Sequence, residues 1–177
     1  QPSTMSDASD PLQTEIGVNT YSSVNLDVSK YKNGDAIPRA QTPAEWTTAN
    51  ANQQGAWCYY DNDLGNGVVY GKLYNHWAVI DTRGLAPNGF SIMSSADWTD
   101  ITGASDPAER LKSQELWSAN EGTDTTGFDA LPAGFREHTA NVNAFQEVLN
   151  KTRYWTSEST PKYVEMVSSA QTLTQNT

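Results

Sequence analysis

Cysteine is almost missing from this sequence, because Cys58 is the only one among its 177 residues. A single thiol cannot form an internal disulfide framework, a thiolate zinc site or a redox pair. Since Cys58 stands between Trp57 and Tyr59, we expect it to be a small buried hydrophobic residue rather than a reactive thiol.

Basic residues and long apolar runs are also scarce. The chain has 11 Lys and Arg against 21 Asp and Glu, which gives a net charge of −10 and a pI of about 4.4. This balance disfavours nucleic acid and anionic membranes as partners and favours cations. No apolar run is long enough to span a bilayer, and the first residues lack the basic and apolar regions of a signal peptide.

Aromatic residues are what the chain has instead, with six Trp, eight Tyr and four Phe. The length suits one domain with an aromatic core. Residues 1–13 are rich in Ser, Asp and Pro, so we interpret them as an interdomain linker and residues 14–177 as a single domain. We expect this domain to be monomeric and part of a longer chain.

Three short helices are predicted from their capping residues. Thr42, Ser94 and Asp106 each precede an acidic residue three positions later, which is the pattern of a capping box or a capped first turn. A longer helix is expected over residues 72–80, because Leu73, Trp77 and Ile80 fall on one stripe. Residues 142–149 are a weaker helical candidate.

Five short strands are predicted between turn residues, at 24–28, 56–60, 127–131, 154–157 and 163–167. Long segments without periodicity separate them, notably 120–127 and 135–153, and such loops are commonly functional. The expected class is α+β, with short antiparallel sheets, one or two main helices and a long irregular loop region.

The ordered motifs along the chain resemble a known family. They are Trp57-Cys58-Tyr59-Tyr60-Asp61-Asn62-Asp63, Tyr70-Gly71-Lys72-Leu73-Tyr74-Asn75, Gly84-Leu85-Ala86-Pro87-Asn88-Gly89-Phe90, Asp97-Trp98-Thr99, Arg110-Leu111-Lys112-Ser113, Gly127 to Arg136, and Tyr154-Trp155-Thr156-Ser157-Glu158. This succession is similar to the Fibrobacter succinogenes major paralogous domain, a bacterial extracytoplasmic module. The resemblance implies a C-type-lectin-like fold.

Two other functions of related folds fit the residues less well. Formylglycine-generating oxidases share the expected fold, but their chemistry depends on paired cysteines, and this chain has only Cys58. Sugar-binding C-type lectins carry a Glu-Pro-Asn or Gln-Pro-Asp tripeptide, and neither occurs here.

The resemblance and the acidic composition together lead to a functional hypothesis. We expect a non-catalytic, calcium-dependent adhesion module of an extracellular bacterial surface protein of the repeat-in-toxin kind, which recognises peptide or protein C-termini. A calcium-dependent glycan-binding module is the alternative, and a formylglycine-generating enzyme is a weaker one. Neither nucleic acid binding nor membrane insertion is expected.

Two acidic loops compete as calcium ligands. The first holds Asp61 and Asp63 beside two glycines, although an Asx-rich turn that binds only its own backbone explains the same residues. The second leads into a predicted strand and provides Glu121, Asp124 and Asp129, which we rank slightly higher.

Ligand contacts are expected from the late loops and strands, where the chain departs most from the family pattern. Aromatic side chains there can anchor a peptide or a sugar face, and amides and carboxylates can orient it. The predicted contact residues are Arg136, Glu137, His138, Asn141, Asn143, Tyr154, Trp155, Glu158 and Tyr163.

Overall fold

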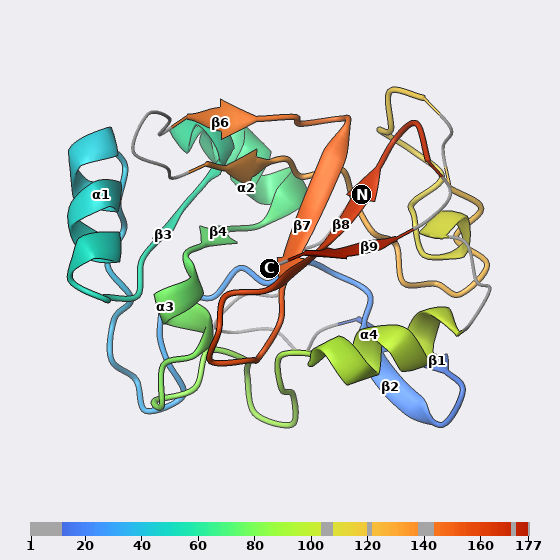
Figure 1. Cartoon of the computed structure of the whole chain (residues 1–177), viewed down its shortest axis with the longest axis horizontal. Coiled ribbons are helices and arrows are strands. Elements are labelled where there is room, and N and C mark those ends of the chain that lie inside the picture. The colour runs from blue at the N-terminus through green and yellow to red at the C-terminus, as the bar shows by residue number, and fades with distance from the viewer. Residues whose placement is uncertain (1–11, 104–107, 120–121, 138–143, 171–172, 177) are drawn as a thin grey trace.

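A computed structural model of the chain describes residues 12–103, 108–119, 122–137, 144–170 and 173–176. Within these segments the fold is α+β, with several short antiparallel sheets and four α-helices (Figure 1). The helices are α1 (Pro43–Ala51), α2 (Leu64–Tyr70), α3 (His76–Val79) and α4 (Ser95–Thr102). The strands are β1 (Gln13–Ile16), β2 (Asn19–Ser22), β3 (Trp57–Cys58), β4 (Leu73–Tyr74), β5 (Phe135–Arg136), β6 (Phe145–Gln146), β7 (Lys151–Trp155), β8 (Tyr163–Val167) and β9 (Thr174–Asn176).

The strands pair mostly with their neighbours in sequence. Strands β1 and β2, β3 and β4, and β5 and β6 form two-stranded antiparallel sheets, and β7, β8 and β9 form a three-stranded one. Strand β1 begins at Gln13, the last residue of the expected linker, and residues 1–11 lie outside the described segments. No helix in the described segments has the length and apolarity needed to cross a membrane.

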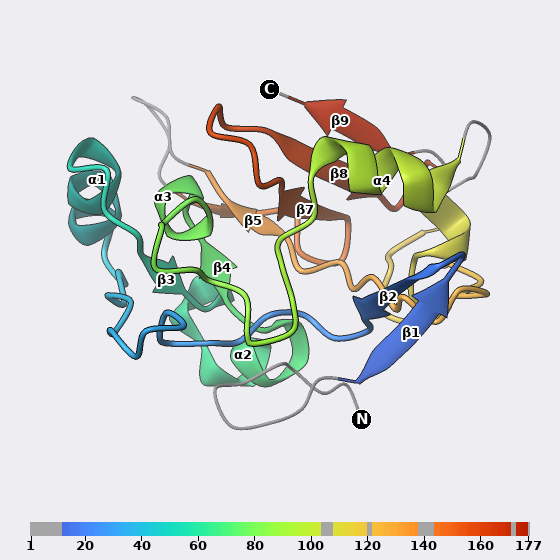
Figure 2. The same cartoon turned by 90° about the horizontal axis from the view of Figure 1, so that it is seen from below.

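The largest core cluster lies between α4 and the three-stranded sheet. Trp98 and Ile101 of α4 pack against Val164 and Met166 of β8, and all four are almost fully buried. Alternation along β8 places these two side chains on one face of the sheet. A second cluster surrounds Trp57 of β3, and two smaller clusters lie around Trp46 and around Tyr70. Helices α1 and α4 lie at opposite ends of the molecule in both views (Figures 1 and 2).

The capping residues predicted two of the helices correctly. The Thr42 hydroxyl accepts a hydrogen bond from the Glu45 N–H, and the Glu45 carboxylate accepts one from the Thr42 N–H, which completes a capping box at α1. Ser94 and Asp97 form the same box at α4. The start expected after Asp106 lies partly outside the described residues, and a single 3-10 turn follows at Ala108–Arg110.

The expected helix over residues 72–80 is wrong. Leu73 and Tyr74 form strand β4 against β3, and the helix starts only at His76. Asn75 separates the two, because its side chain accepts hydrogen bonds from the N–H groups of Ala78 and of the distant Ala56. A contact to a residue 19 positions away therefore ends the strand and begins the helix.

Several strand predictions also need correction. The segment 163–167 is confirmed as β8, and 56–60 and 154–157 overlap the observed β3 and β7. Residues 24–28 form no strand, and the hairpin of β1 and β2 was not predicted. Residues 127–131 contribute only a single bridge at Ala130, and the described part of 142–149 contains β6 instead of a helix.

Candidate functional site

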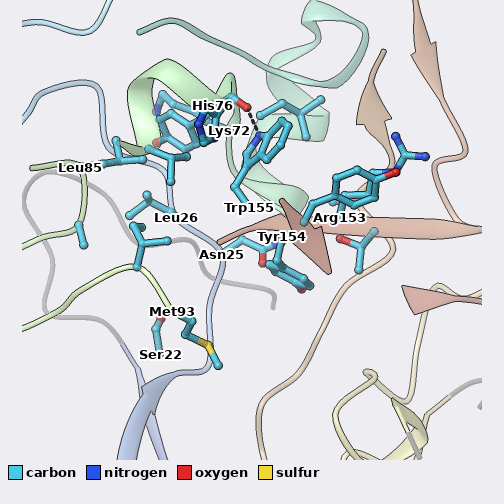
Figure 3. A pocket seen from close by; sticks show the side chains of 18 of the residues that line it. Ser22, Asn25, Leu26, Lys72, His76, Leu85, Met93, Arg153, Tyr154 and Trp155 are labelled. Carbon is cyan, nitrogen blue, oxygen red and sulfur yellow. Dashed lines mark hydrogen bonds between the residues drawn. The ribbon is translucent and has the colours of Figure 1, made fainter. Parts of the chain in front are cut away.

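A cavity of about 790 Å³ lies where the two largest core clusters meet. This volume is within the range of roughly 300–1,000 Å³ found for small-molecule sites in proteins. From the first cluster it is lined by Met93, Trp98, Phe128 and Tyr154. From the second it is lined by Leu26, Tyr74, Leu85 and Ile92. Segments from the start, the middle and the end of the chain therefore enclose one space (Figure 3).

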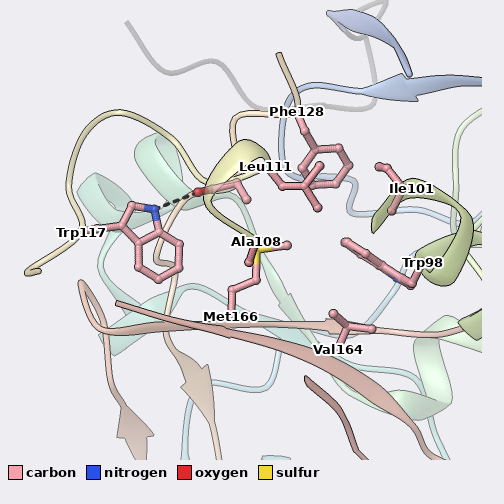
Figure 4. Packing of buried hydrophobic residues seen from close by; sticks show 9 residues of the cluster. Trp98, Ile101, Ala108, Leu111, Trp117, Phe128, Val164 and Met166 are labelled. Carbon is pink, nitrogen blue, oxygen red and sulfur yellow. Dashed lines mark hydrogen bonds between the residues drawn. The ribbon is translucent and has the colours of Figure 1, made fainter. Parts of the chain in front are cut away.

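Strand β7 divides the cavity wall into two kinds of surface. Figure 3 shows Tyr154 on one side of β7, and Arg153 and Trp155 on the other. On the inner side, Tyr154 packs against the rings of Trp98 and Phe128, which belong to the cluster shown in Figure 4. Met93 packs against the same cluster and also lines the cavity. The inner side is thus suited to apolar groups of a ligand.

Aromatic rings form the outer side of the cavity. The rings of Trp155 and Tyr163 meet edge to face, with centroids 5.9 Å apart. The Trp155 indole N–H donates a hydrogen bond to the carbonyl oxygen of Tyr74, at 2.8 Å, and its ring lies 5.4 Å from that of His76. Trp155 is therefore held rigidly by β4 and α3, and a rigid aromatic side chain is a good ligand anchor.

His76 has one polar atom in its buried ring that forms no hydrogen bond. Its Nε2 lies 3.2 Å from the carbonyl oxygen of Ser159, and this oxygen can only accept, so Nε2 carries the proton in the neutral ring. Its Nδ1 is then an acceptor and has no hydrogen-bond partner among the described residues. Buried polar atoms of this kind are uncommon, and His76 lines the cavity.

The basic side chains along the cavity all have structural partners. Lys72 forms an ion pair with Asp27 and lies over the Trp57 ring. The guanidinium of Arg153 pairs with Glu165 at 2.8 Å and Glu137 at 3.4 Å.

Arg136, the third base, belongs to strand β5. Its guanidinium donates to the carbonyl oxygens of Ala40 and Gln41 and lies over the Trp46 ring. The charged side chains of the cavity wall therefore form intramolecular contacts that stabilise the fold.

The structure brings five of the predicted ligand contacts to this cavity: Arg136, Glu137, Tyr154, Trp155 and Tyr163. Glu158 is placed elsewhere, at the start of α4, where its Oε1 accepts a hydrogen bond from the Ser95 N–H at 2.7 Å. The Thr156 hydroxyl and this N–H lower the pKa of Glu158 to about 2. His138, Asn141 and Asn143 lie outside the described residues.

Most of the cavity wall could not be found in the sequence. Leu26 lies in a predicted strand and Leu85 in a family motif, but each is an ordinary apolar residue, and neither pattern shows that it lines a cavity together with Met93. Lys72 lies inside a recognisable motif and His76 directly follows it, but nothing in the motif shows that they face a cavity.

Two of the predicted calcium ligands lie close together. The Asp129 N–H donates a hydrogen bond to Asp124 Oδ1 at 2.9 Å, and both residues have a positive φ. Burial raises the pKa of both carboxyl groups, and for Asp129 the negative charges of Asp124 and Glu115 raise it further. Glu121, the third member of the predicted set, lies outside the described residues.

The other predicted pair has a local role. Asp63 caps α2, with its Oδ1 accepting from the Gly65 N–H at 2.6 Å, and Asp61 is exposed in a 3-10 turn. Across the described segments, no group of three or more His, Cys, Asp or Glu side chains is placed to hold a metal ion.

The comparison with protein families identifies the chain. A family model described as the Fibrobacter succinogenes major domain matches residues 14–176. The chain belongs to this family. The match begins within β1 and ends within β9, so it includes every helix and strand of the fold and the whole wall of the cavity. Neither the curated proteins nor the solved structures gave a match.

Proposed function

We propose that this domain is a non-catalytic ligand-binding module of an extracellular bacterial adhesin, and that its ligand occupies the cavity beside β7. The observation that carries the proposal is the cavity of about 790 Å³, lined by the firmly held Trp155 and by Tyr163. Large concave sites with rigid aromatic anchors are the usual form of ligand sites in proteins.

A peptide or protein ligand fits the cavity better than a glycan. Sugar hydroxyl groups need many polar partners, but the cavity wall offers apolar side chains such as Leu26, Leu85 and Met93. Apolar peptide side chains would gain about 25 cal/mol for each Å² that such a wall removes from water. A glycan stacked on Trp155 remains the alternative, because that ring faces the more polar side of the cavity.

Cys58 supports a binding function over an oxidase function. Its side chain is fully buried in β3, and burial raises the pKa of the thiol. A thiol that resists ionisation is a poor nucleophile and a poor metal ligand.

The finer parts of the proposal rest on the family and on composition. Membership of the Fibrobacter succinogenes major domain family supports an extracytoplasmic bacterial module with a C-type-lectin-like arrangement. The net charge of −10 supports a calcium-dependent adhesin. Asp124 and Asp129 are the described residues that such a calcium site would use, together with Glu121.

Two binding screens test the proposal directly. The purified domain would be screened against a displayed library of random linear decapeptides and against a glycan array, each with calcium and with chelator. We expect peptides to be enriched and glycans not to be. Enrichment of glycans alone would support the lectin alternative, and no binding in either screen would contradict the proposal.

Cavity-filling variants then locate the ligand. Met93→Trp fills the inner wall, and Ser91→Trp obstructs an exposed part of the lining, where folding tolerates a large side chain. Val68→Trp is the matched control, because Val68 is exposed on α2 and is not part of the lining. We expect both cavity variants to weaken binding of the selected peptide at least tenfold and the control to leave it unchanged. Equal affinity of all three variants would place the ligand elsewhere.

A further inference from the structure

Three Asn-Gly pairs occur in the chain, at Asn33-Gly34, Asn66-Gly67 and Asn88-Gly89. An Asn that precedes Gly can lose its side-chain amide without an enzyme. The backbone nitrogen of the glycine attacks the side-chain carbon, and a glycine has no Cβ to hinder the attack. The reaction needs an unrestrained carboxamide and a peptide group that can rotate toward it. The fold therefore decides which of the three pairs reacts.

The first pair is held by its own turn, although both of its residues are exposed. The Asn33 carboxamide donates to the Asp35 carboxylate at 3.0 Å and accepts a hydrogen bond from the Asp35 N–H at 3.0 Å. The Gly34 N–H donates to the Tyr31 carbonyl oxygen at 2.9 Å. Both reacting groups are engaged, so the reaction would have to break these hydrogen bonds first.

The second pair lies inside α2. The Asn66 side chain donates to the Tyr60 carbonyl oxygen at 3.1 Å, and the Gly67 N–H donates to the Asp63 carbonyl oxygen at 3.1 Å as part of the helix. Gly67 is also buried, with the ring of Tyr59 directly over its Cα. Helix α2 would therefore have to open before this peptide group could turn, and such local opening costs free energy.

The third pair differs from both. Asn88 and Gly89 are exposed at the centre of a turn, which is closed by a hydrogen bond of 3.1 Å from the Phe90 N–H to the Pro87 carbonyl oxygen. Gly89 has a φ of +85°, and apart from its chain neighbours no atom lies within 4 Å of the place a Cβ would take. Among the described residues, none forms a hydrogen bond with the Asn88 carboxamide or with the peptide group between Asn88 and Gly89. This peptide group can therefore rotate toward the side chain without breaking a contact.

We propose that Asn88 is a site of spontaneous deamidation and that the fold protects Asn33 and Asn66. The Gly89 nitrogen loses its proton to hydroxide and forms a bond to the Asn88 Cγ. The bond between this carbon and the side-chain nitrogen breaks, and ammonia leaves with a proton from water, which regenerates the hydroxide. The product is a five-membered succinimide. One water molecule then opens the ring at either carbonyl, which gives an aspartate or an isoaspartate at position 88.

The modification changes the wall of the cavity. Pro87, Gly89 and Phe90 line the cavity, so a carboxylate at position 88 adds a negative charge beside an exposed part of the lining. An isoaspartate also lengthens the main chain of the turn, because the chain then runs through the former side-chain carbon. The reaction needs no ligand, so it occurs whether or not the cavity binds a peptide.

Mass spectrometry of the folded domain tests the site. The purified domain would be kept at pH 8 and 37 °C, sampled over several weeks and digested. The mass gained when a hydroxyl group replaces the amide nitrogen then reports deamidation at each Asn separately. We expect Asn88 to react at least tenfold faster than Asn33 and Asn66, with both aspartate and isoaspartate as products. Similar rates at the three positions, or a faster reaction at Asn33 or Asn66, would overturn the proposal.

Two controls separate the fold from the local sequence. In guanidinium chloride the three pairs lose their hydrogen bonds, so we expect their rates to become similar. An equally large preference for Asn88 in the unfolded chain would contradict protection by the fold. Asn88→Gln keeps an exposed amide but places it one methylene further from the backbone, which slows ring closure. We expect this variant to stay unmodified at position 88 and to keep the parent rates at Asn33 and Asn66, and mass gain at the parent rate in the same fragment would contradict the assignment.

Discussion

The indole N–H of Trp155 donates a hydrogen bond of 2.8 Å to the carbonyl oxygen of Tyr74. The two residues lie 81 positions apart in the sequence. This bond joins β7 to β4 across the cavity (Figure 3). It holds the anchor ring in one orientation before any ligand arrives, and side chains ordered in advance lose less entropy on binding.

Replacement of Trp155 by Phe tests this bond. The variant keeps an aromatic ring and loses the donor, so we expect the free energy of unfolding to fall by about 1 kcal/mol and Tm by about 2–4 °C. Trp77→Phe is the control, because the Trp77 indole forms no hydrogen bond with the described residues. Thermal unfolding of both variants measures the difference, and equal losses would argue against a stabilising bond.

The carboxylate of Glu158 should stabilise the fold above acidic pH. Its pKa falls from 4.5 to about 2 in the folded state, so the ionised group stabilises the fold above pH 4.5. This contribution disappears as the pH falls from about 4.5 to about 2, because the folded state then binds the proton as well. At pH 7 we expect Glu158→Gln to cost about 0.5–1 kcal/mol, since Glu158 acts on the N-terminus of α4.

Denaturant unfolding between pH 2 and 7 measures this effect. Glu15→Gln is the control, because Glu15 is exposed on β1. A constant difference between Glu158→Gln and the parent across this range would contradict the assignment.

Asp124 and Asp129 give opposite expectations with and without calcium. Burial raises both pKa values in the folded state, so ionisation destabilises the metal-free fold as the pH rises through the range of these groups. In chelator at pH 7, Asp129→Asn should therefore raise Tm by about one to three degrees. Asn also tolerates the positive φ of this position.

With calcium present, the parent domain should have a higher Tm than the Asn variants if the predicted site exists. A cation bound only by the folded state raises Tm. We expect that rise in the parent domain and its loss in the double variant Asp124→Asn with Asp129→Asn, with Asp61→Asn as the control at the other predicted loop. Scanning calorimetry with and without calcium measures both effects. If calcium does not change the Tm of the parent domain, the calcium dependence is refuted.

The capping box of α4 should carry a measurable part of the stability. The Ser94 hydroxyl accepts from the Asp97 N–H and donates to its carboxylate at 2.7 Å. We expect Ser94→Ala to lower the free energy of unfolding by about 1 kcal/mol. Asp100→Ala, at an exposed position of the same helix, should change it by less than about 0.5 kcal/mol. Denaturant unfolding distinguishes these values, and equal changes would argue against the cap.

Local signals predicted the elements that depend on local contacts. Thr42 with Glu45, and Ser94 with Asp97, satisfy helix N–H groups within three residues, so the caps were visible in the sequence. Asn75 shows the limit of such reasoning. Its side chain bonds to Ala56, and this distant contact converts an apparent helical stripe into a strand followed by one short helix.

The candidate site was only half predictable for the same reason. Tyr154, Trp155 and Tyr163 were expected because aromatic residues in late strands often form binding faces, and they do line the cavity. Glu158 was also a predicted contact, but its carboxylate binds the Ser95 N–H at the start of α4 instead. Nothing in the sequence marked Leu26 or Met93 as a cavity residue, because only folding brings their segments together.

The sequence by itself determined the family, the α+β class, the capped helices and the aromatic core, since these follow from ordered motifs and from contacts within a few residues. Only the tertiary structure decided where the cavity lies and which charges already have partners. These properties depend on groups such as Tyr74 and Trp155, which are remote in the chain and meet only because burial of the two apolar clusters brings their segments together.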